Sequence, residues 1–264
     1  MQLAVDTFRH WGRAQFRKYK GCVASLQSRD LKGDLSVGTC FHVGDGVFVT
    51  ARHVVEGRFE LKMEFDDDAT SIELIQTVIP HIKAEPAGVK IISGPYCHPD
   101  PQVDVACFKT DFALKEFMPL GGHLDDYLSQ YEFILHRVLV LGYPPIPLTN
   151  RAALVANVGE VNAAVELYVQ DQKRVHFLVS TMARGGFSGG PVLIAYNELN
   201  EESGTAVLGV VTQSLVANYA PAESGHMAVL SVDPIYECLE AASLLPQCQS
   251  SITAIHNEMN DFPW

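Results

Sequence analysis

Apolar residues in this chain come in short runs, roughly four to nine residues long, that turn residues separate from one another. Runs of this length and spacing are typical of the strands of a β-sandwich or β-barrel, and Gly44-Asp45-Gly46 between two of them predicts a hairpin. The expected strands are 22–27, 38–43, 47–50, 59–65, 72–79, 89–92, 103–108, 133–141, 153–158, 165–169, 175–180, 191–195, 206–213 and 227–232. The sequence therefore predicts an all-β protein.

Composition divides the chain into five segments. Residues 1–20 are basic and aromatic and are expected to form a short amphipathic helix that is an appendage to the rest. The other segments are a first all-β half (21–112), a linker rich in turn residues (113–132), a second all-β half (133–232) and a helix with a tail (233–264), and each half is expected to be a sandwich or a barrel. Asp233-Pro234 supplies a helix cap and a proline for the first turn, so we expect a helix at about 234–244, followed by a loosely held polar tail from Gln247.

Charge and composition argue against several kinds of partner. The formal net charge of −12 disfavours binding to nucleic acid. No apolar run approaches the roughly 20 residues of a membrane span, and the start lacks the features of a secretory signal, so we expect a cytoplasmic protein without a membrane partner. The six cysteines are spaced singly, which predicts free thiols. Cys40 and His42 could share a metal with Cys97 and His98, but strand spacing explains them equally well, and no metal or cofactor is expected.

The run 185–191 places Ser188 among glycines and before Pro191. Glycines let a backbone bend sharply and point successive N–H groups at one spot, which would give a nucleophilic serine an oxyanion hole. A glycine turn between strands is the alternative for this run taken alone.

Two further residues have the chemistry that an activated serine needs, which is a base and a carboxylate that orients it. His53 follows the expected strand 47–50, where it is positioned by regular structure and can still meet solvent. Asp104 lies within the apolar run 103–108, where a carboxylate needs a hydrogen-bond donor such as an imidazole.

The three motifs, taken together, resemble those of the chymotrypsin-fold, trypsin-like serine proteases, in particular the HtrA/Deg-like branch without a PDZ domain. Thr50-Ala51-Arg52-His53, Asp104-Val105-Ala106 and Gly186-Phe187-Ser188-Gly189-Gly190-Pro191 match the motifs of the family in chain order. Leu141-Gly142-Tyr143-Pro144 resembles the turn that opens the second barrel in the Deg-like branch. The resemblance covers about residues 21–244 and implies two six-stranded antiparallel β-barrels, a chymotrypsin-like double barrel, with a C-terminal helix.

This resemblance also implies roles for individual residues. Ser188 would be the nucleophile, His53 the general base and acid, and Asp104 the orienting carboxylate, with the N–H groups of Gly186 and Ser188 as the oxyanion hole. The positions that would bind substrate are Met182, Ala183, Gly185, Val211, Thr212, Gln213 and Ser214. The hydroxyl of Thr212 would support the triad carboxylate, and residues 211–214 would pair with the substrate backbone as an added strand.

Two positions depart from the pattern of the family. Zymogen-activated relatives have an aspartate where this chain has Phe187, so we expect packing or an allosteric partner to set the oxyanion loop. Met182 stands at the position that resembles the floor of the specificity pocket, which predicts apolar or small side chains before the scissile bond.

Fewer than 35 residues follow Val232, too few for a PDZ-like domain, so cage assembly of the Deg kind is not expected.

Ser188 also fits the nucleophile elbow of α/β-hydrolases, but Gly189-Gly190-Pro191 is a poor start for the helix that must follow that elbow. The leading hypothesis is therefore a serine endopeptidase that acts on protein or peptide substrates. The alternative is a latent protease-fold binding or scaffold subunit that a regulatory protein partner activates.

Overall fold

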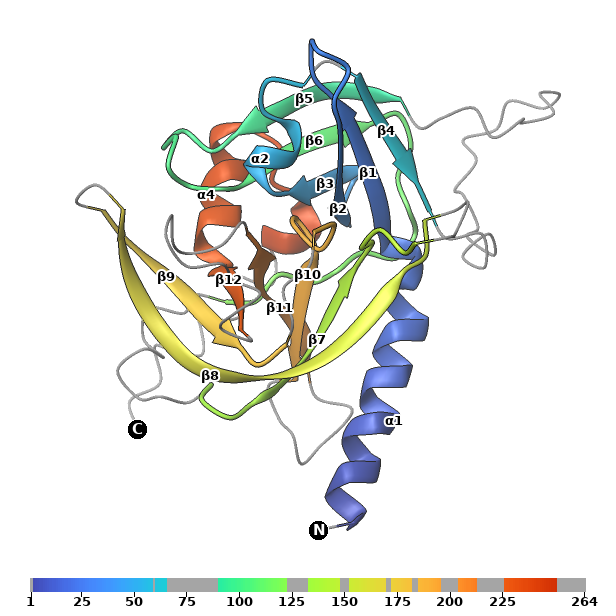
Figure 1. Cartoon of the computed structure of the whole chain (residues 1–264), viewed down its shortest axis with the longest axis vertical. Helices are drawn as coiled ribbons and strands as arrows, with labels where there is room; N and C mark the ends of the chain where they lie inside the picture. Colours follow the sequence, from blue (N-terminus) through green and yellow to red (C-terminus); the bar gives the residue numbers. More distant parts are fainter. Residues whose placement is uncertain are drawn as a thin grey trace, which may run out of the picture.

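Two six-stranded antiparallel sheets form the body of the protein (Figure 1). The computed structural model describes residues 2–58, 60–65, 90–122, 133–147, 152–169, 172–181, 185–195, 204–212 and 226–250. Its elements are α1 (Gln2–Tyr19), η1 (Lys20–Cys22), β1 (Val23–Arg29), β2 (Leu35–Gly44), β3 (Val47–Thr50), α2 (Arg52–Val55), β4 (Glu60–Glu64), β5 (Ile91–Cys97), β6 (Ala106–Thr110), β7 (Arg137–Gly142), β8 (Val155–Val169), β9 (Gln172–Val179), β10 (Pro191–Ala195), β11 (Thr205–Val211), β12 (Met227–Ser231) and α4 (Asp233–Ala241).

The strand orders confirm the predicted chymotrypsin-like double barrel. The first sheet has the order β4-β1-β2-β3-β6-β5, and among the described residues it is open between β4 and β5. The second is a closed barrel with the order β10-β11-β12-β9-β8-β7. The predicted hairpin joins β2 to β3, and Gly44, Asp45 and Gly46 all have positive φ angles (123°, 50° and 76°), which glycine and aspartate tolerate best.

The two strands expected at 153–158 and 165–169 are one long strand, β8. In the gap between the two expected strands, Glu160 and Asn162 face outward while Gly159 and Val161 are buried, so the alternation of a strand continues through the gap. A register shift between Val161 and Ala163 accommodates the bend. The strand expected at 72–79 lies outside the described residues.

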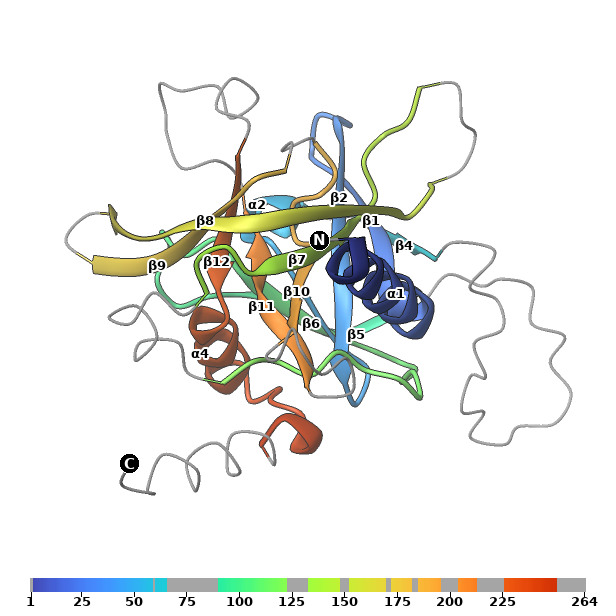
Figure 2. The ribbon, with the colours of Figure 1, turned by 90° about the horizontal axis from the view of Figure 1, so that it is seen from below.

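The N-terminal helix α1 is longer than expected, at 18 residues, and it is not an appendage. Trp11 and Tyr19 are buried and belong to the same hydrophobic cluster as the core of the second barrel. The indole N–H of Trp11 donates to the hydroxyl of Thr205 on β11, over 3.0 Å. Figure 2, a view from below, shows α1 in front of β1 and next to β7. Aromatic burial therefore fixes the helix to the barrel.

The chain after β12 also differs from expectation. Asp233 is the first residue of α4 rather than its cap, and the cap residue, Val232, makes no side-chain capping bond. The tail is held firmly at Gln249, which is fully buried and hydrogen-bonds to the carbonyls of Val43 and Met118 and to the N–H of Leu120. Residues 251–264 lie outside the described part. None of the helices in the described ranges is long and apolar enough to cross a membrane.

Candidate active site

His53 and Asp104 meet at the end of the first sheet. His53 lies in the short helix α2, directly after β3, and Asp104 lies in the connection that leads into β6, two residues before the strand rather than within it. The His53 Nδ1 atom is 2.7 Å from Asp104 Oδ2, and the His53 backbone N–H donates to Asp104 Oδ1 over 2.9 Å. The two side chains are 28% and 23% exposed, so the pair is accessible to a ligand.

The geometry of this pair determines which ring nitrogen of His53 carries the hydrogen. An ionised carboxylate only accepts hydrogen bonds, so the Nδ1 atom of His53 carries the hydrogen that it shares with Asp104. In the neutral ring the Nε2 atom then keeps its lone pair, which is the tautomer that a general base requires.

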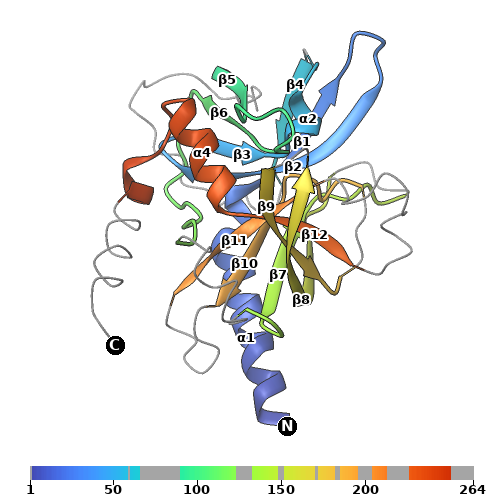
Figure 3. The same ribbon diagram turned by 90° about the vertical axis from the view of Figure 1, so that its left-hand side faces the viewer.

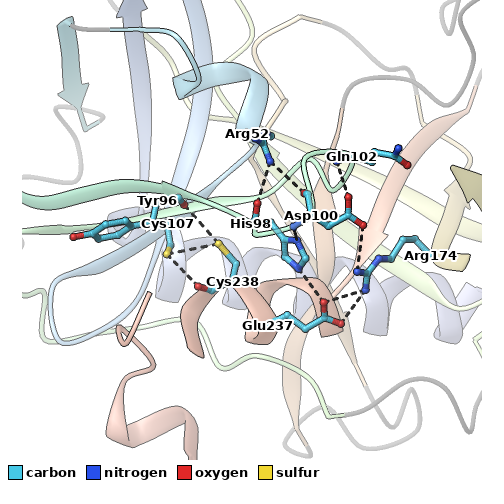
Figure 4. A network of polar contacts seen from close by, with 9 residues as sticks. All are labelled: Arg52, Tyr96, His98, Asp100, Gln102, Cys107, Arg174, Glu237 and Cys238. Carbon is cyan, nitrogen blue, oxygen red and sulfur yellow. Dashed lines mark hydrogen bonds and ion pairs between the residues drawn. The ribbon is translucent and has the colours of Figure 1, made fainter. Parts of the chain in front are cut away.

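Arg52 fixes the loop that leads to Asp104. Its guanidinium donates to the carbonyls of His98 (3.0 Å) and Asp100 (3.2 Å), and it also pairs with Glu56, the residue directly after α2. The helix that carries His53 is thereby tied to the loop that carries its partner. Figure 4 shows Arg52 reaching the two carbonyls of this loop.

A polar network continues from this loop to the second barrel (Figure 4). The Asp100 N–H donates to Nδ1 of His98, so His98 carries its hydrogen on Nε2 and donates it to Glu237 of α4 over 2.9 Å. Glu237 in turn accepts two bonds from Arg174 of β9 (2.9 and 3.0 Å), and Arg174 lies 3.7 Å from Asp100. Both barrels therefore hold the loop that precedes Asp104.

The glycine loop can form only with glycine at two of its positions. Gly186 and Gly189 have positive φ angles of 91° and 82°. A Cβ at Gly186 would lie 2.7 Å from the Cα of Pro144, and one at Gly189 would lie 2.7 Å from the backbone nitrogen of Ala51. The loop thus packs backbone to backbone against the turn at Tyr143-Pro144 on one side and against the segment before His53 on the other.

Thr39 was not singled out in the sequence, yet it organises this loop. Its hydroxyl donates to the carbonyl of Gly186 (2.6 Å) and accepts the N–H of Tyr143 (3.0 Å), while its N–H donates to the carbonyl of Ser188 (2.8 Å). The one sequence signal was a hydroxyl between the apolar residues of β2, where burial demands hydrogen-bond partners.

Ser188 lies beside the His53 segment. A Cβ at Gly38 would fall 2.6 Å from the side chain of Val54 and 3.1 Å from the Ser188 carbonyl, so the neighbour of His53 and the backbone of Ser188 flank one glycine. Within the described residues the Ser188 hydroxyl makes no hydrogen bond, including none to His53. The N–H groups of Gly186 and Ser188 donate no hydrogen bond in that part of the chain either, so they can serve a ligand.

Phe187 is 1% exposed and belongs to the hydrophobic cluster of the second barrel. A Cβ at Gly142 would lie 2.5 Å from the Phe187 ring, so the ring rests against the backbone of β7. The Phe187 carbonyl accepts the N–H of Gly190 (2.8 Å). A buried aromatic ring therefore occupies the position at which the resemblance places an aspartate in zymogen-activated relatives.

The substrate-binding positions are only partly described. Gly185 is exposed, and a Cβ there would meet open space. Val211 exchanges backbone hydrogen bonds with Gly189 and Gly190 of the glycine loop. Thr212 is buried directly after β11, and among the described residues its hydroxyl makes no hydrogen bond to Asp104, unlike the support expected from the sequence. Met182, Ala183, Gln213 and Ser214 lie outside the described residues.

The possible metal ligands are used in other ways. Both ring nitrogens of His42 bond to the backbone, Nδ1 to the carbonyl of Glu116 and Nε2 to the N–H of Gly46, and burial lowers the pKa of His42 to about 4. Among the residues that the structure describes, no group of three or more His, Cys, Asp or Glu could hold a metal ion. All six cysteines are free thiols, as predicted, and the sulfurs of Cys107 on β6 and Cys238 on α4 lie 3.7 Å apart.

Comparison with known proteins agrees with this fold. The model of the trypsin-like peptidase domain matches residues 38–199. The active form of the Rv3671c protease from M. tuberculosis is 20% identical, with a TM-score of 0.58 over 85% of this chain and 82% of that one. The HtrA-type protease AlgW with a tripeptide is 15% identical, with a TM-score of 0.58 over 86% of this chain and 61% of that one. The serine endoprotease from Yersinia pestis is 15% identical, with a TM-score of 0.53 over 88% and 66%.

No curated protein matches the chain in sequence. The three structural likenesses are likenesses of fold, whereas the family model spans more than half of the chain. The chain belongs to the trypsin-like peptidase domain family, which identifies it as a serine peptidase.

Proposed function

We propose that the protein is a serine endopeptidase in which Ser188, His53 and Asp104 form the catalytic triad. The observation that carries this proposal is the 2.7 Å contact between His53 Nδ1 and Asp104, with a second bond from the His53 backbone to the same carboxylate. A histidine held in this tautomer beside a glycine-rich serine loop has the chemistry of a general base for that serine.

In this mechanism Ser188 Oγ attacks the carbonyl carbon of the scissile peptide bond, and His53 Nε2 takes the hydroxyl proton. The C–N bond then breaks, and His53 returns the proton to the leaving amine, which leaves an acyl group on Ser188. Water repeats the sequence with His53 as its base and releases the carboxylic acid. Asp104 stays ionised throughout and stabilises the imidazolium.

Charge develops on the carbonyl oxygen during both steps. The N–H groups of Gly186 and Ser188 are the proposed donors to this oxygen, which is supported by their lack of other acceptors in the described part of the chain. Removal of one such donor costs about 10²–10³-fold in kcat in enzymes of this kind. Because Gly186 occupies a conformation that needs glycine, no side chain can replace it without moving the loop.

Substrates are proposed to be proteins or peptides with an apolar or small residue before the scissile bond. Met182, the residue proposed for the floor of the pocket, carries no charge that would select arginine or lysine. Residues 211–214 are proposed to pair with the substrate backbone as an added strand, and the N–H groups of Val211 and Thr212 already donate to the carbonyls of Gly190 and Ala228.

A peptide-cleavage screen tests this proposal. We expect wild-type protein to cleave peptides with Val, Ala, Leu or Met before the scissile bond at least about tenfold faster than Arg or Lys peptides, since even one methylene group in an apolar pocket is worth about 1–3 kcal/mol. Ser188→Ala should cleave none of them while it melts at the same temperature.

Two results of this screen would contradict the proposal. A clear preference for arginine would show that Met182 does not form the floor of the pocket. Cleavage that survives in Ser188→Ala would exclude Ser188 as the nucleophile. If the wild type cleaves only after a second protein is added, the latent-subunit alternative applies.

A further inference from the structure

A groove of about 890 Å³ lies between α1 and the outer face of the second barrel, and the proposed mechanism does not use it. One wall is formed by α1 from Arg9 to Arg17 together with Lys20 of η1, and the other by β7, β8 and Leu154 just before β8. In Figures 1 and 3 α1 forms the lower end of the molecule, whereas α2, the helix that carries His53, lies near the top.

The floor of the groove is apolar where the outside of a barrel is usually polar. Leu154, Ala156 and Val158 are every second residue along β8 and its approach, so they share the outward face of the barrel. Leu139 of β7 pairs with Val158 and extends the same surface, and Phe16 of α1 borders it. Val158 is 56% exposed. An apolar stripe of this kind, left partly open, marks a binding surface.

The helix wall is basic. Arg9, Arg13 and Arg17 are four residues apart, so they form one stripe that runs roughly 12 Å along the helix. Among the described residues none of the three has a carboxylate within ion-pair distance, although the chain as a whole carries a formal charge of −12. The one acidic residue that lines the groove, Glu160 of β8, lies 3.7 Å from Arg137 of β7, and both residues belong to the wall that faces α1.

We propose that this groove binds an acidic amphipathic segment of a partner protein. The repeated arginines require several negative charges spaced along one ligand, which a helix with an acidic residue at every fourth position supplies. An anionic amphiphile with a single head group would neutralise one arginine and leave the others. Apolar side chains on the other face of the segment would cover the floor around Val158. The inference concerns docking alone and does not depend on the catalytic proposal.

The test measures anisotropy of a fluorescein-labelled twelve-residue helical peptide that has glutamate at every fourth position and leucines between, mixed with the full chain. We expect saturable binding that weakens as salt rises, and no binding of a matched peptide with glutamine for glutamate. The double variant Arg13→Glu/Arg17→Glu and the single variant Val158→Asp should each weaken binding at least about tenfold. Arg29→Glu, a matched change at an exposed arginine outside the groove, should leave the affinity within about twofold.

Four results would overturn the proposal. The first is equal binding of the peptide by the wild type and by the Arg13→Glu/Arg17→Glu variant. The second is equal binding of the glutamate and glutamine peptides. The third is binding of phosphatidylserine vesicles without binding of the peptide, and this result would assign the groove to a membrane surface. The fourth is a dimer seen by light scattering that Arg13→Glu/Arg17→Glu abolishes, which would assign the groove to a second copy of the chain. Arg13→Gln keeps the helix wall polar and serves where charge reversal disturbs folding.

Discussion

Asp104→Asn is expected to lower kcat for peptide hydrolysis by about 10⁴-fold while the fold is retained. The asparagine oxygen can still accept the His53 backbone N–H, which now donates to Asp104 Oδ1 over 2.9 Å. Its NH₂ group, however, faces His53 Nδ1 as a donor, so the imidazole must carry its hydrogen on Nε2 instead. The lone pair that would take the proton from Ser188 is then lost.

Steady-state kinetics with the best peptide of the screen, together with thermal unfolding, check this expectation. Asp100→Asn is the matched control, because Asp100 lies on the same loop and accepts the N–H of Gln102 (2.9 Å) without contacting His53. It should reduce kcat by far less than Asp104→Asn. If Asp104→Asn keeps more than about a tenth of the wild-type kcat, the carboxylate does not orient the base.

Phe187→Ala should destabilise the protein by about 3–5 kcal/mol and also slow the reaction of Ser188. The ring is buried against Gly142, and the residue lies between the two proposed oxyanion donors, Gly186 and Ser188. Without the ring, the glycine loop loses this apolar contact with the backbone of β7. Phe187→Leu, which refills most of the space, should recover a large part of both losses.

Thermal unfolding and the rate of labelling by a fluorophosphonate, measured below the lowest melting temperature, separate the two effects. Phe177→Ala is the control, since Phe177 is equally buried in the same cluster but lies on β9, which pairs with β8 and β12 and not with the strand β10 that follows the loop. It should lose similar stability and keep the wild-type labelling rate. Equal labelling rates for Phe187→Ala and Phe177→Ala would mean that packing of Phe187 does not set the loop.

Local patterns predicted the fold well because most strands in this chain are short, apolar and bounded by glycine or other turn residues. The hairpin at Gly44–Gly46 and strand β10 at Pro191–Ala195 were predicted to the residue or nearly so. The predictions were wrong where packing between segments far apart in the chain determines the length of a strand or the burial of a side chain. Polar residues hid the continuity of β8, and neither the burial of Trp11 on the second barrel nor that of Gln249 leaves a local signal.

The site could be predicted in part. His53 and Asp104 were named from their strand contexts, and the structure brings them into contact. The supports of the site could not be named, because Thr39, Arg52 and Glu237 act through contacts with residues far along the chain. The feature that no motif encodes is therefore how the barrels hold the loops between them.

The central claim is that Ser188 is the activated nucleophile, and intact-mass analysis after fluorophosphonate treatment tests it most directly. We expect one phosphonyl group per folded chain, found on Ser188 by peptide fragmentation, and no adduct on Ser188→Ala or on heat-unfolded wild type. An adduct on another residue, or a folded wild-type chain that takes up no probe, would contradict the claim.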